Sequence, residues 1–208
     1  MIRCLDIHTH HTAPCPEAVV ACGPSEFSPI ENQRYSIGIH PWNTVNEISP
    51  SLWRLFESYC ERPEVVAIGE AGIDTLKGGL LFKQMIIFRR QIDLSENLHK
   101  PLIIHDVRAH DIIVGLRREM KPAQNWVIHG FRGKPTVAKM LIDCGIWLSF
   151  GEKFNFDSLK NTPREMMLAE TDESKLSIHE IINNLSAVTG FEMSGVIADN
   201  TSRFLAET

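Results

Sequence analysis

Six side chains whose chemistry suits metal binding follow short apolar runs along the chain: His8, His10, Glu70, His105, His129 and Asp172. Imidazole nitrogens and carboxylate oxygens, without thiolates, favour a catalytic site for Zn²⁺, Mn²⁺ or Mg²⁺ over a structural zinc site. A catalytic zinc usually takes three protein ligands and a water, so six candidates suit two ions that share a bridging carboxylate. Neutral histidines and two carboxylates would leave such a pair of ions with a net positive charge, which favours an anionic substrate such as a phosphodiester.

The apolar runs that precede these residues predict the elements that position them. Eight runs are rich in β-branched residues, at 3–8, 18–22, 35–40, 65–70, 102–105, 126–129, 146–149 and 167–170. Most are continuously apolar, which is typical of parallel strands buried on both faces. Helical patterns follow the third to sixth runs and the eighth, at 50–59, 80–98, 111–120, 135–144, 178–189 and 192–206. This alternation indicates an α/β fold, and a TIM-like (β/α) barrel would bring the carboxyl ends of the strands to one rim.

The length of the chain restricts the kind of barrel that it can form. Its 208 residues allow 26 for each of eight βα units, near the lower end of the roughly 200 to 400 residues of this fold. Helical patterns are missing from 11–17 and 23–34, so we expect one shortened barrel domain, 1–208, that lacks helices after its first two strands. A seven-stranded or partly open barrel, in which 18–22 is not a barrel strand, is the alternative. A homo-oligomer in which a second subunit covers the open flank is a further hypothesis.

Composition argues against several other classes of protein. The net charge is −5, from 21 basic and 26 acidic side chains, so the overall balance does not indicate a protein that holds the DNA backbone. The five cysteines have no CxxC spacing, which is typical of reduced thiols in a cytoplasmic protein. No apolar run approaches the roughly 18 residues of a membrane span, and the first residues lack the apolar stretch of a signal peptide. We therefore expect a cytoplasmic protein without a membrane partner.

Short motifs along nearly the whole chain occur in the order found in a known family, at 6–10, 38–41, 68–74, 101–108, 129–133, 145–151 and 168–172. The first reads Asp-Ile-His-Thr-His and the last ends in Glu-Thr-Asp. Further matches lie in two of the expected helices, at Gln84, Phe88, Gln91, Asn200 and Phe204. The sequence resembles the TatD family of metal-dependent hydrolases, which belongs to the amidohydrolase-like barrels.

The resemblance implies a TIM-like barrel with up to two divalent ions and a hydrolase activity that is deoxyribonuclease activity in several relatives. It assigns the candidate ligands to two ions: His8, His10 and Asp172 to the first, His105 and His129 to the second, and Glu70 to both. A metal-bound hydroxide would attack phosphorus, with Asp172 accepting or steering its proton. Asp172 and Glu70 are therefore the expected catalytic residues, and many amidohydrolase relatives place a carbamylated lysine where this chain has Glu70.

Three further residues are candidates for substrate binding, namely His40, Arg108 and Arg132. His40 could instead contact a metal ligand or form a hydrogen bond at the rim. Arg108 could pair with a carboxylate of the rim, and Arg132 could lie with Lys134 in a solvated loop. Asp74 could orient a ligand histidine or cap a loop.

The chain departs from the family after Glu-Thr-Asp, where a proline-containing loop with an arginine is usual. Here 173–175 leads almost directly to a helix that begins near Ser177. Because loops at this rim determine the substrate of a barrel enzyme, the metal chemistry is better supported than DNA as the substrate. The alternatives are a hydrolase of a small ester, amide or lactone on the same metal site, and a metal-binding barrel without catalytic activity.

Overall fold

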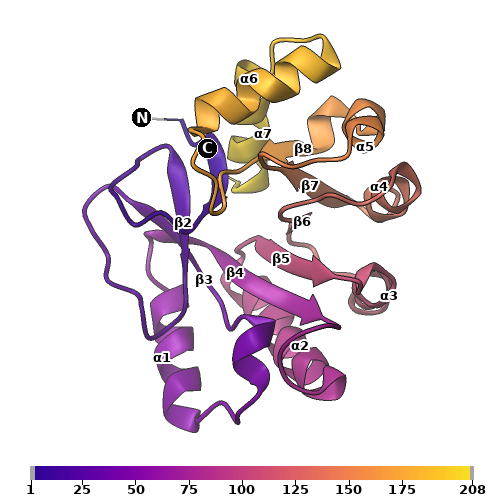
Figure 1. Cartoon of the computed structure of the whole chain (residues 1–208). Coiled ribbons are helices and arrows are strands. Elements are labelled where there is room, and N and C mark those ends of the chain that lie inside the picture. Colours follow the sequence, from indigo (N-terminus) through magenta and orange to yellow (C-terminus); the bar gives the residue numbers. More distant parts are fainter. Residues whose placement is uncertain (1–2, 207–208) are drawn as a thin grey trace.

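Eight parallel strands form a closed barrel in chain order in the computed structural model, which describes residues 3–206 (Figure 1). The strands are β1 (Asp6–Thr9), β2 (Ala18–Cys22), β3 (Arg34–Ile37), β4 (Val65–Asp74), β5 (Leu102–Val107), β6 (Trp126–Ile128), β7 (Ile146–Phe150) and β8 (Met167–Ala169). β2 pairs with both of its neighbours, so the eight-stranded barrel is confirmed and the seven-stranded alternative is wrong. β1 and β8 close the ring through Asp6 and Ala169, with one more bridge between Thr9 and Asp172.

Residues 3–206 also form seven α-helices and two short 3₁₀ helices, of which α6 and α7 follow the last strand: η1 (Pro41–Thr44), α1 (Pro50–Cys60), α2 (Leu81–Leu98), α3 (His110–Met120), α4 (Pro135–Ile142), α5 (Phe156–Asn161), η2 (Arg164–Met166), α6 (Ile178–Thr189) and α7 (Ser194–Phe204). The sequence did not predict α5, because a helix of six residues is too short to show a helical period. Its start is marked only by Asn155, whose side chain accepts a hydrogen bond from the backbone of Ser158.

Capping residues determine where the helices nearest the barrel rim begin. Ser49 accepts a hydrogen bond from the backbone N–H of Leu52 and is followed by Pro50, which has no N–H of its own to satisfy. Ser177 and Glu180 form a reciprocal capping box at the start of α6. Five residues, 173–177, separate Asp172 from the start of α6, so the rim loop between them is short.

No α-helix follows β1 or β2 within the described residues, as the sequence predicts. The loop at 23–33 covers this flank instead, which Figure 1 shows as indigo chain beside β2 and β3. Phe27 of this loop packs against Tyr35 and Tyr59, with ring centroids 5.2 and 4.9 Å apart. The outward side chain of Val20 in β2 is buried as a result.

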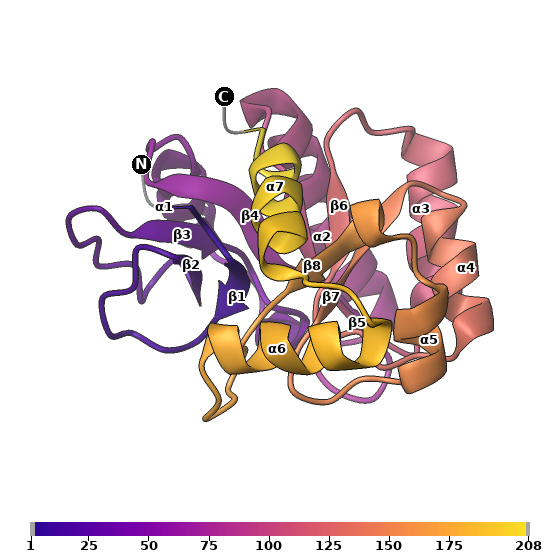
Figure 2. The ribbon, with the colours of Figure 1, turned by 90° about the horizontal axis from the view of Figure 1, so that it is seen from above.

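Apolar side chains fill the interior of the barrel, so it is a packed core and not a channel. Seven strands each contribute one: Ile7, Val19, Ala67, Ile103, Val127, Trp147 and Leu168. Phe204 at the end of α7 closes the amino-terminal end of this core, with its ring 5.9 Å from that of Trp147. Figure 2 shows α7 running alongside β8, where Asn200 donates two hydrogen bonds, to the carbonyls of Arg164 and Met167.

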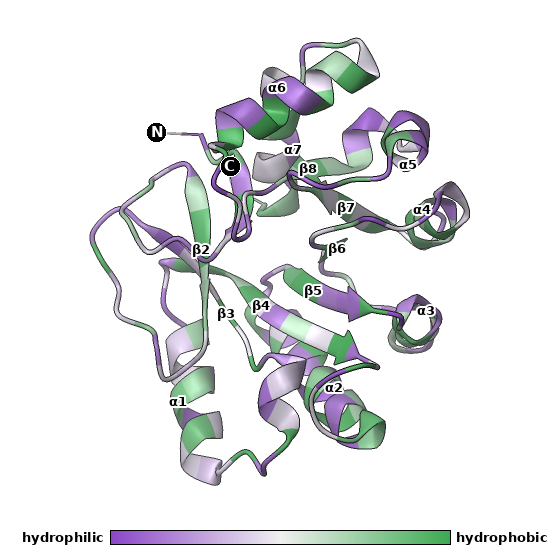
Figure 3. Ribbon diagram, in the orientation of Figure 1, coloured by the Kyte–Doolittle hydropathy of each residue, from purple (hydrophilic) through white to green (hydrophobic). Residues whose placement is uncertain are grey.

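Polarity changes along the strands toward their carboxyl ends. In Figure 3, β5 is green in its first part and purple just before its green tip, because Leu102, Ile103 and Ile104 are followed by His105 and Asp106 and then by Val107. Polar side chains of the barrel therefore collect at one rim, opposite the end that Phe204 closes.

The residues that the structure describes contain no helix long and apolar enough to cross a membrane. The structure describes all five cysteines and joins none of them in a disulfide.

Candidate metal centre

The six predicted metal ligands come together at the carboxyl-terminal rim. His8, Glu70 and His105 lie in strands β1, β4 and β5. His10, His129 and Asp172 follow the ends of β1, β6 and β8. Gly38, after β3, allows this convergence, because a Cβ atom there would collide with the backbone carbonyl of Glu70.

The two oxygens of Glu70 face different pairs of histidines. Oε2 lies 3.6 Å from His8 Nε2 and 3.5 Å from His10 Nε2. Oε1 lies 2.6 Å from His105 Nδ1 and 2.8 Å from His129 Nε2. A carboxylate placed in this way has the geometry of a bridge between two metal sites.

Asp172 completes the first of the two groups. Its Oδ1 atom lies 3.9 Å from His8 Nε2 and 3.8 Å from His10 Nε2, so the three donor atoms can reach one ion. Asp172 has a backbone φ of 52°, a left-handed conformation that is uncommon for a residue with a side chain. The local backbone is therefore strained at the position of a predicted catalytic group.

The environment of His8 supports a metal ligand at this position. Its ring is fully buried, and neither nitrogen has a hydrogen-bond partner among the described residues. A buried polar atom without a partner is unfavourable, and a coordinated cation would satisfy Nε2. Burial also lowers the pKa of His8 to about 3, so the ring stays in the neutral form that binds metals.

Glu70 and His129 form a buried pair of opposite charge in the absence of an ion. Burial opposes ionisation of Glu70, but the neighbouring imidazoles of His129, His10 and His105 hold its pKa well below the ordinary value. Burial likewise opposes protonation of His129, but the Glu70 carboxylate raises its pKa well above the ordinary value. The same carboxylate raises the pKa of His10.

Two carboxylates lie behind the ligand histidines. Asp74 Oδ2 is 3.4 Å from His105 Nε2, and Glu170 Oε1 is 3.4 Å from His129 Nδ1. Histidines that bind metals usually present their second nitrogen to such a group, which fixes the ring orientation. Asp74 also caps a loop, since its Oδ1 accepts the backbone N–H groups of Leu76 and Lys77, while the orientation of a ligand histidine stays a prediction.

Sequence reasoning did not single out Glu170. Its position in the Glu-Thr-Asp motif, directly after β8 and two residues before Asp172, is the signal that could have identified it. The side chain is fully buried, and such a carboxylate needs a partner like His129.

His40 lies closer to Glu70 than the sequence could indicate. Its Nε2 atom is 3.1 Å from Glu70 Oε1 and 3.3 Å from His105 Nδ1. Its Nδ1 atom accepts the backbone N–H of Trp42, so the neutral ring carries its proton on Nε2 and donates it to Glu70. His40 therefore contacts a ligand residue directly, while its contact with substrate stays a prediction.

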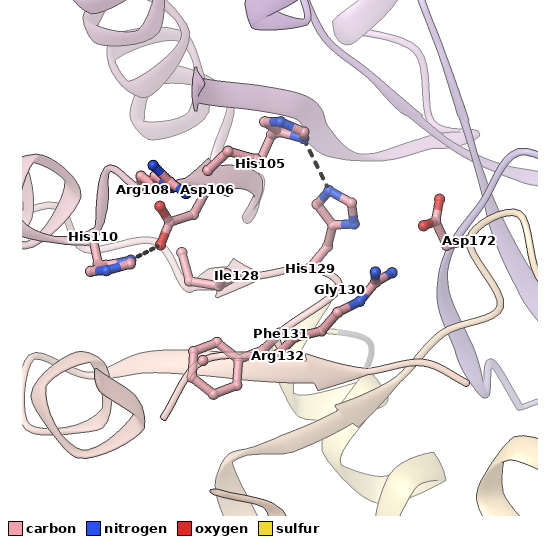
Figure 4. Close-up of a pocket in the computed structure, with 12 residues that line it drawn as sticks. His105, Asp106, Arg108, His110, Ile128, His129, Gly130, Phe131, Arg132 and Asp172 are labelled. Carbon is pink, nitrogen blue, oxygen red and sulfur yellow. Dashed lines mark hydrogen bonds and ion pairs between the residues drawn. The ribbon is translucent and has the colours of Figure 1, made fainter. Parts of the chain in front are cut away.

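Arg108 and Arg132 line a cavity of about 390 Å³ that also includes His105, His129 and Asp172. Figure 4 shows Arg132 extending toward the end of the cavity where Asp172 lies, whereas Arg108 lies beside Asp106 at the other end. The two arginines thus reach the cavity from different loops, after β5 and after β6. Lys134, which lies two residues after Arg132, is not among the residues that line this cavity.

Comparison with known proteins identifies the family. Residues 29–203 match the family model described as "TatD related DNase". The chain belongs to the TatD family.

Two curated TatD relatives illustrate the similarity. An uncharacterized metal-dependent hydrolase of Buchnera aphidicola is 33% identical over 155 residues, which cover 70% of this chain and 58% of that protein. The uncharacterized metal-dependent hydrolase YabD of Bacillus subtilis is 28% identical over 194 residues, which cover 81% of this chain and 75% of YabD. The chain therefore spans about three-fifths of the length of the Buchnera relative.

A solved structure from the same family confirms the fold. The Escherichia coli TatD homolog YjjV superposes with a TM-score of 0.82 at 18% identity, and the alignment covers 99% of both chains. The closed barrel of this chain is therefore the TatD barrel, despite the missing helices after β1 and β2.

Proposed function

We propose that this TatD-family chain is a divalent-metal-dependent hydrolase that cleaves phosphodiester bonds. The observation that carries the proposal is the Glu70 carboxylate, whose two oxygens each face a separate pair of histidines. The family description names a DNase, and the Buchnera and Bacillus relatives are named metal-dependent hydrolases.

We propose that the six candidate ligands hold two ions. The first ion would take His8, His10 and Asp172, the second would take His105 and His129, and Glu70 would serve both. Zn²⁺ fits the imidazole nitrogens of this set best, whereas Mn²⁺ and Mg²⁺ would rely more on the carboxylate oxygens and on water. Two such ions would supply Lewis-acid chemistry, which activates water and neutralises charge on phosphoryl oxygens.

Side chains around the cavity would bind the phosphate, accept a proton from water and position Glu70. Arg108 and Arg132 are placed to bind phosphate oxygens from two sides, as guanidinium groups do well. Asp172 faces the cavity with 29% of its side chain exposed, and burial raises its pKa, which suits a group that accepts a proton from water. His40 would keep the Glu70 carboxylate in place through its Nε2–H.

A reconstitution assay with a matched pair of variants tests this proposal. The protein is stripped with a chelator, reloaded with Zn²⁺, Mn²⁺ or Mg²⁺, and assayed with bis-p-nitrophenyl phosphate and with DNA oligonucleotides. We expect turnover that depends on the metal and that Glu70→Gln lowers by about 100-fold or more, because the variant loses the bridging charge. The control is Glu61→Gln, which alters an exposed carboxylate at the end of α1.

The outcome of the same assay separates the alternatives. Hydrolysis of amide or lactone substrates in place of phosphodiesters would contradict the proposed substrate class but keep the metal centre. Metal binding without turnover of any substrate would indicate a non-catalytic barrel. The cytoplasmic location and the homo-oligomer stay predictions.

A further inference from the structure

Trp42 is an exposed aromatic side chain beside the metal centre. It lies in η1, two residues after His40, and 46% of its side chain is exposed. Its indole Nε1–H donates a 2.6 Å hydrogen bond to Asp74 Oδ2, the same oxygen that lies 3.4 Å from His105 Nε2. The hydrogen bond holds an exposed ring in one place next to a ligand histidine.

Neither of the two histidine rings beside Trp42 stacks face to face with its indole. The imidazoles of His40 and His105 have centroids 4.8 and 5.9 Å away, but they are inclined at 80° and 77° to the indole. Neither histidine therefore lies parallel to the indole. The Lys77 ammonium lies over the indole, 4.2 Å from the ring centroid, on an exposed side chain, so a base that stacked on that face would displace it.

Trp42 and its neighbour Lys77 offer the two features with which proteins bind single-stranded nucleic acids, an aromatic ring and a positive charge. Two exposed apolar residues lie in the same segments as these groups: Val45, three residues after Trp42, is 59% exposed, and Leu76, next to Lys77, is 61% exposed. Lys77 supplies a positive charge within reach of a phosphate. An anchored aromatic surface with a neighbouring cation is the usual combination for stacking a base and pairing its backbone.

We propose that Trp42 is a specificity-determining residue whose indole stacks on the nucleobase next to the scissile phosphate, with Lys77 pairing with the adjoining phosphate. This inference rests on the proposed phosphodiesterase function and adds the recognition of a base to it. The substrate would extend from the arginine-lined cavity past Glu70 and His105 to Trp42.

A pair of variants separates stacking from the hydrogen bond to Asp74. Trp42→Phe and Trp42→Leu both lose the indole N–H, so both loosen Asp74 in the same way. Only phenylalanine keeps an aromatic face. The difference between the two variants therefore reports stacking alone, whatever the loss of the hydrogen bond does to His105.

The kinetic test compares an oligonucleotide that carries thymine next to the scissile bond with one that carries an abasic site there. Base–aromatic stacking predicts that the wild type prefers the thymine substrate by roughly 10-fold in KM. Trp42→Phe should keep most of this preference and Trp42→Leu should lose it. An equal preference in both variants would overturn the proposal and leave Trp42 as a positioning residue for Asp74.

Fluorescence gives a binding readout that does not need turnover. The other three tryptophans, Trp53, Trp126 and Trp147, are buried, so quenching by a ligand reports mainly on Trp42. In the Glu70→Gln background, hexathymidylate should quench the emission and the same backbone with abasic sites should not. Quenching by neither oligonucleotide overturns the inference. Absence of phosphodiester turnover together with base-dependent quenching would instead contradict only the proposed reaction.

Discussion

At the scale of single residues, Glu70 is the side chain that contacts most of the other candidate ligands at the rim. Its carboxylate contacts both histidine pairs, and His40 adds a hydrogen bond to it. The positions of the ligands at strand ends were readable from the sequence, since each follows an apolar run. Glu170 was missed although it lies in the Glu-Thr-Asp motif, and Trp42 was missed because no spacing pattern in the sequence connects it to the candidate ligands. Only the fold shows that Asp74 lies between Trp42 and His105.

The charges around Glu70 predict that metal binding depends on pH. The pKa values of His10 and His129 are raised, so their ion pairs with Glu70 stabilise the metal-free protein fully below the ordinary value near 6.5. This stability is lost as the pH rises through the raised pKa values. A metal ion must displace these protons, so the apparent metal affinity should increase with pH over the same range.

Calorimetry in buffers of different ionisation enthalpy measures this proton release. We expect roughly one to two protons released for each loaded protein near pH 6.5, and fewer at higher pH. His10→Gln should release fewer protons than the wild type. A binding enthalpy that does not depend on the buffer would contradict the prediction.

At the scale of elements, the sequence predicted the strands better than their ends. Continuous apolar runs are a strong signal because parallel strands are buried on both faces. β4 was expected to end at Glu70, yet it continues to Asp74, which pairs with Val107 of β5. Polar residues at a rim interrupt the apolar pattern before the hydrogen-bonded ladder ends. The absence of helices after β1 and β2 was predicted, but the covering role of Phe27 depends on tertiary contacts that no local pattern encodes.

The capping box of α6 gives a prediction at this scale. Ser177→Ala removes the acceptor for the Glu180 backbone N–H, which should cost about 1 kcal/mol and lower the Tm by roughly 2–4 °C. Ser58→Ala is the control, since Ser58 is exposed within α1 and caps no helix. Thermal unfolding followed by circular dichroism measures both, and equal Tm values for Ser177→Ala and the wild type would count against the role of the cap.

At the scale of the whole molecule, the residue that closes the barrel core and the candidate metal ligands lie at opposite ends of the barrel. Phe204 closes the amino-terminal end of the core, while the ligands lie at the carboxyl ends of the strands. The chain's own loop at 23–33 packs on the flank without helices through Phe27, while the homo-oligomer stays a prediction.

Truncation of Phe204 tests whether the closed end of the core can be destabilised without a change in metal binding at the other end. Phe204→Ala should destabilise the protein by about 3–5 kcal/mol, because it leaves a cavity beneath the barrel core. Phe82→Ala, at a position that is 56% exposed, should change stability by less than about 0.5 kcal/mol. Denaturant unfolding gives both values, and metal affinity at a temperature where the variant is folded should match the wild type. A loss of affinity in folded Phe204→Ala would show that the two ends are coupled.

The joint between β1 and β8 has a consequence for how the protein is held together. β1 carries His8, Asp172 follows β8, and the first and last strands meet there through few backbone contacts. An ion held by His8, His10 and Asp172 would span the joint between the two ends of the sheet. Metal binding and closure of the barrel would then be linked equilibria, and the ion would cross-link the first and last strands in addition to its role in the reaction.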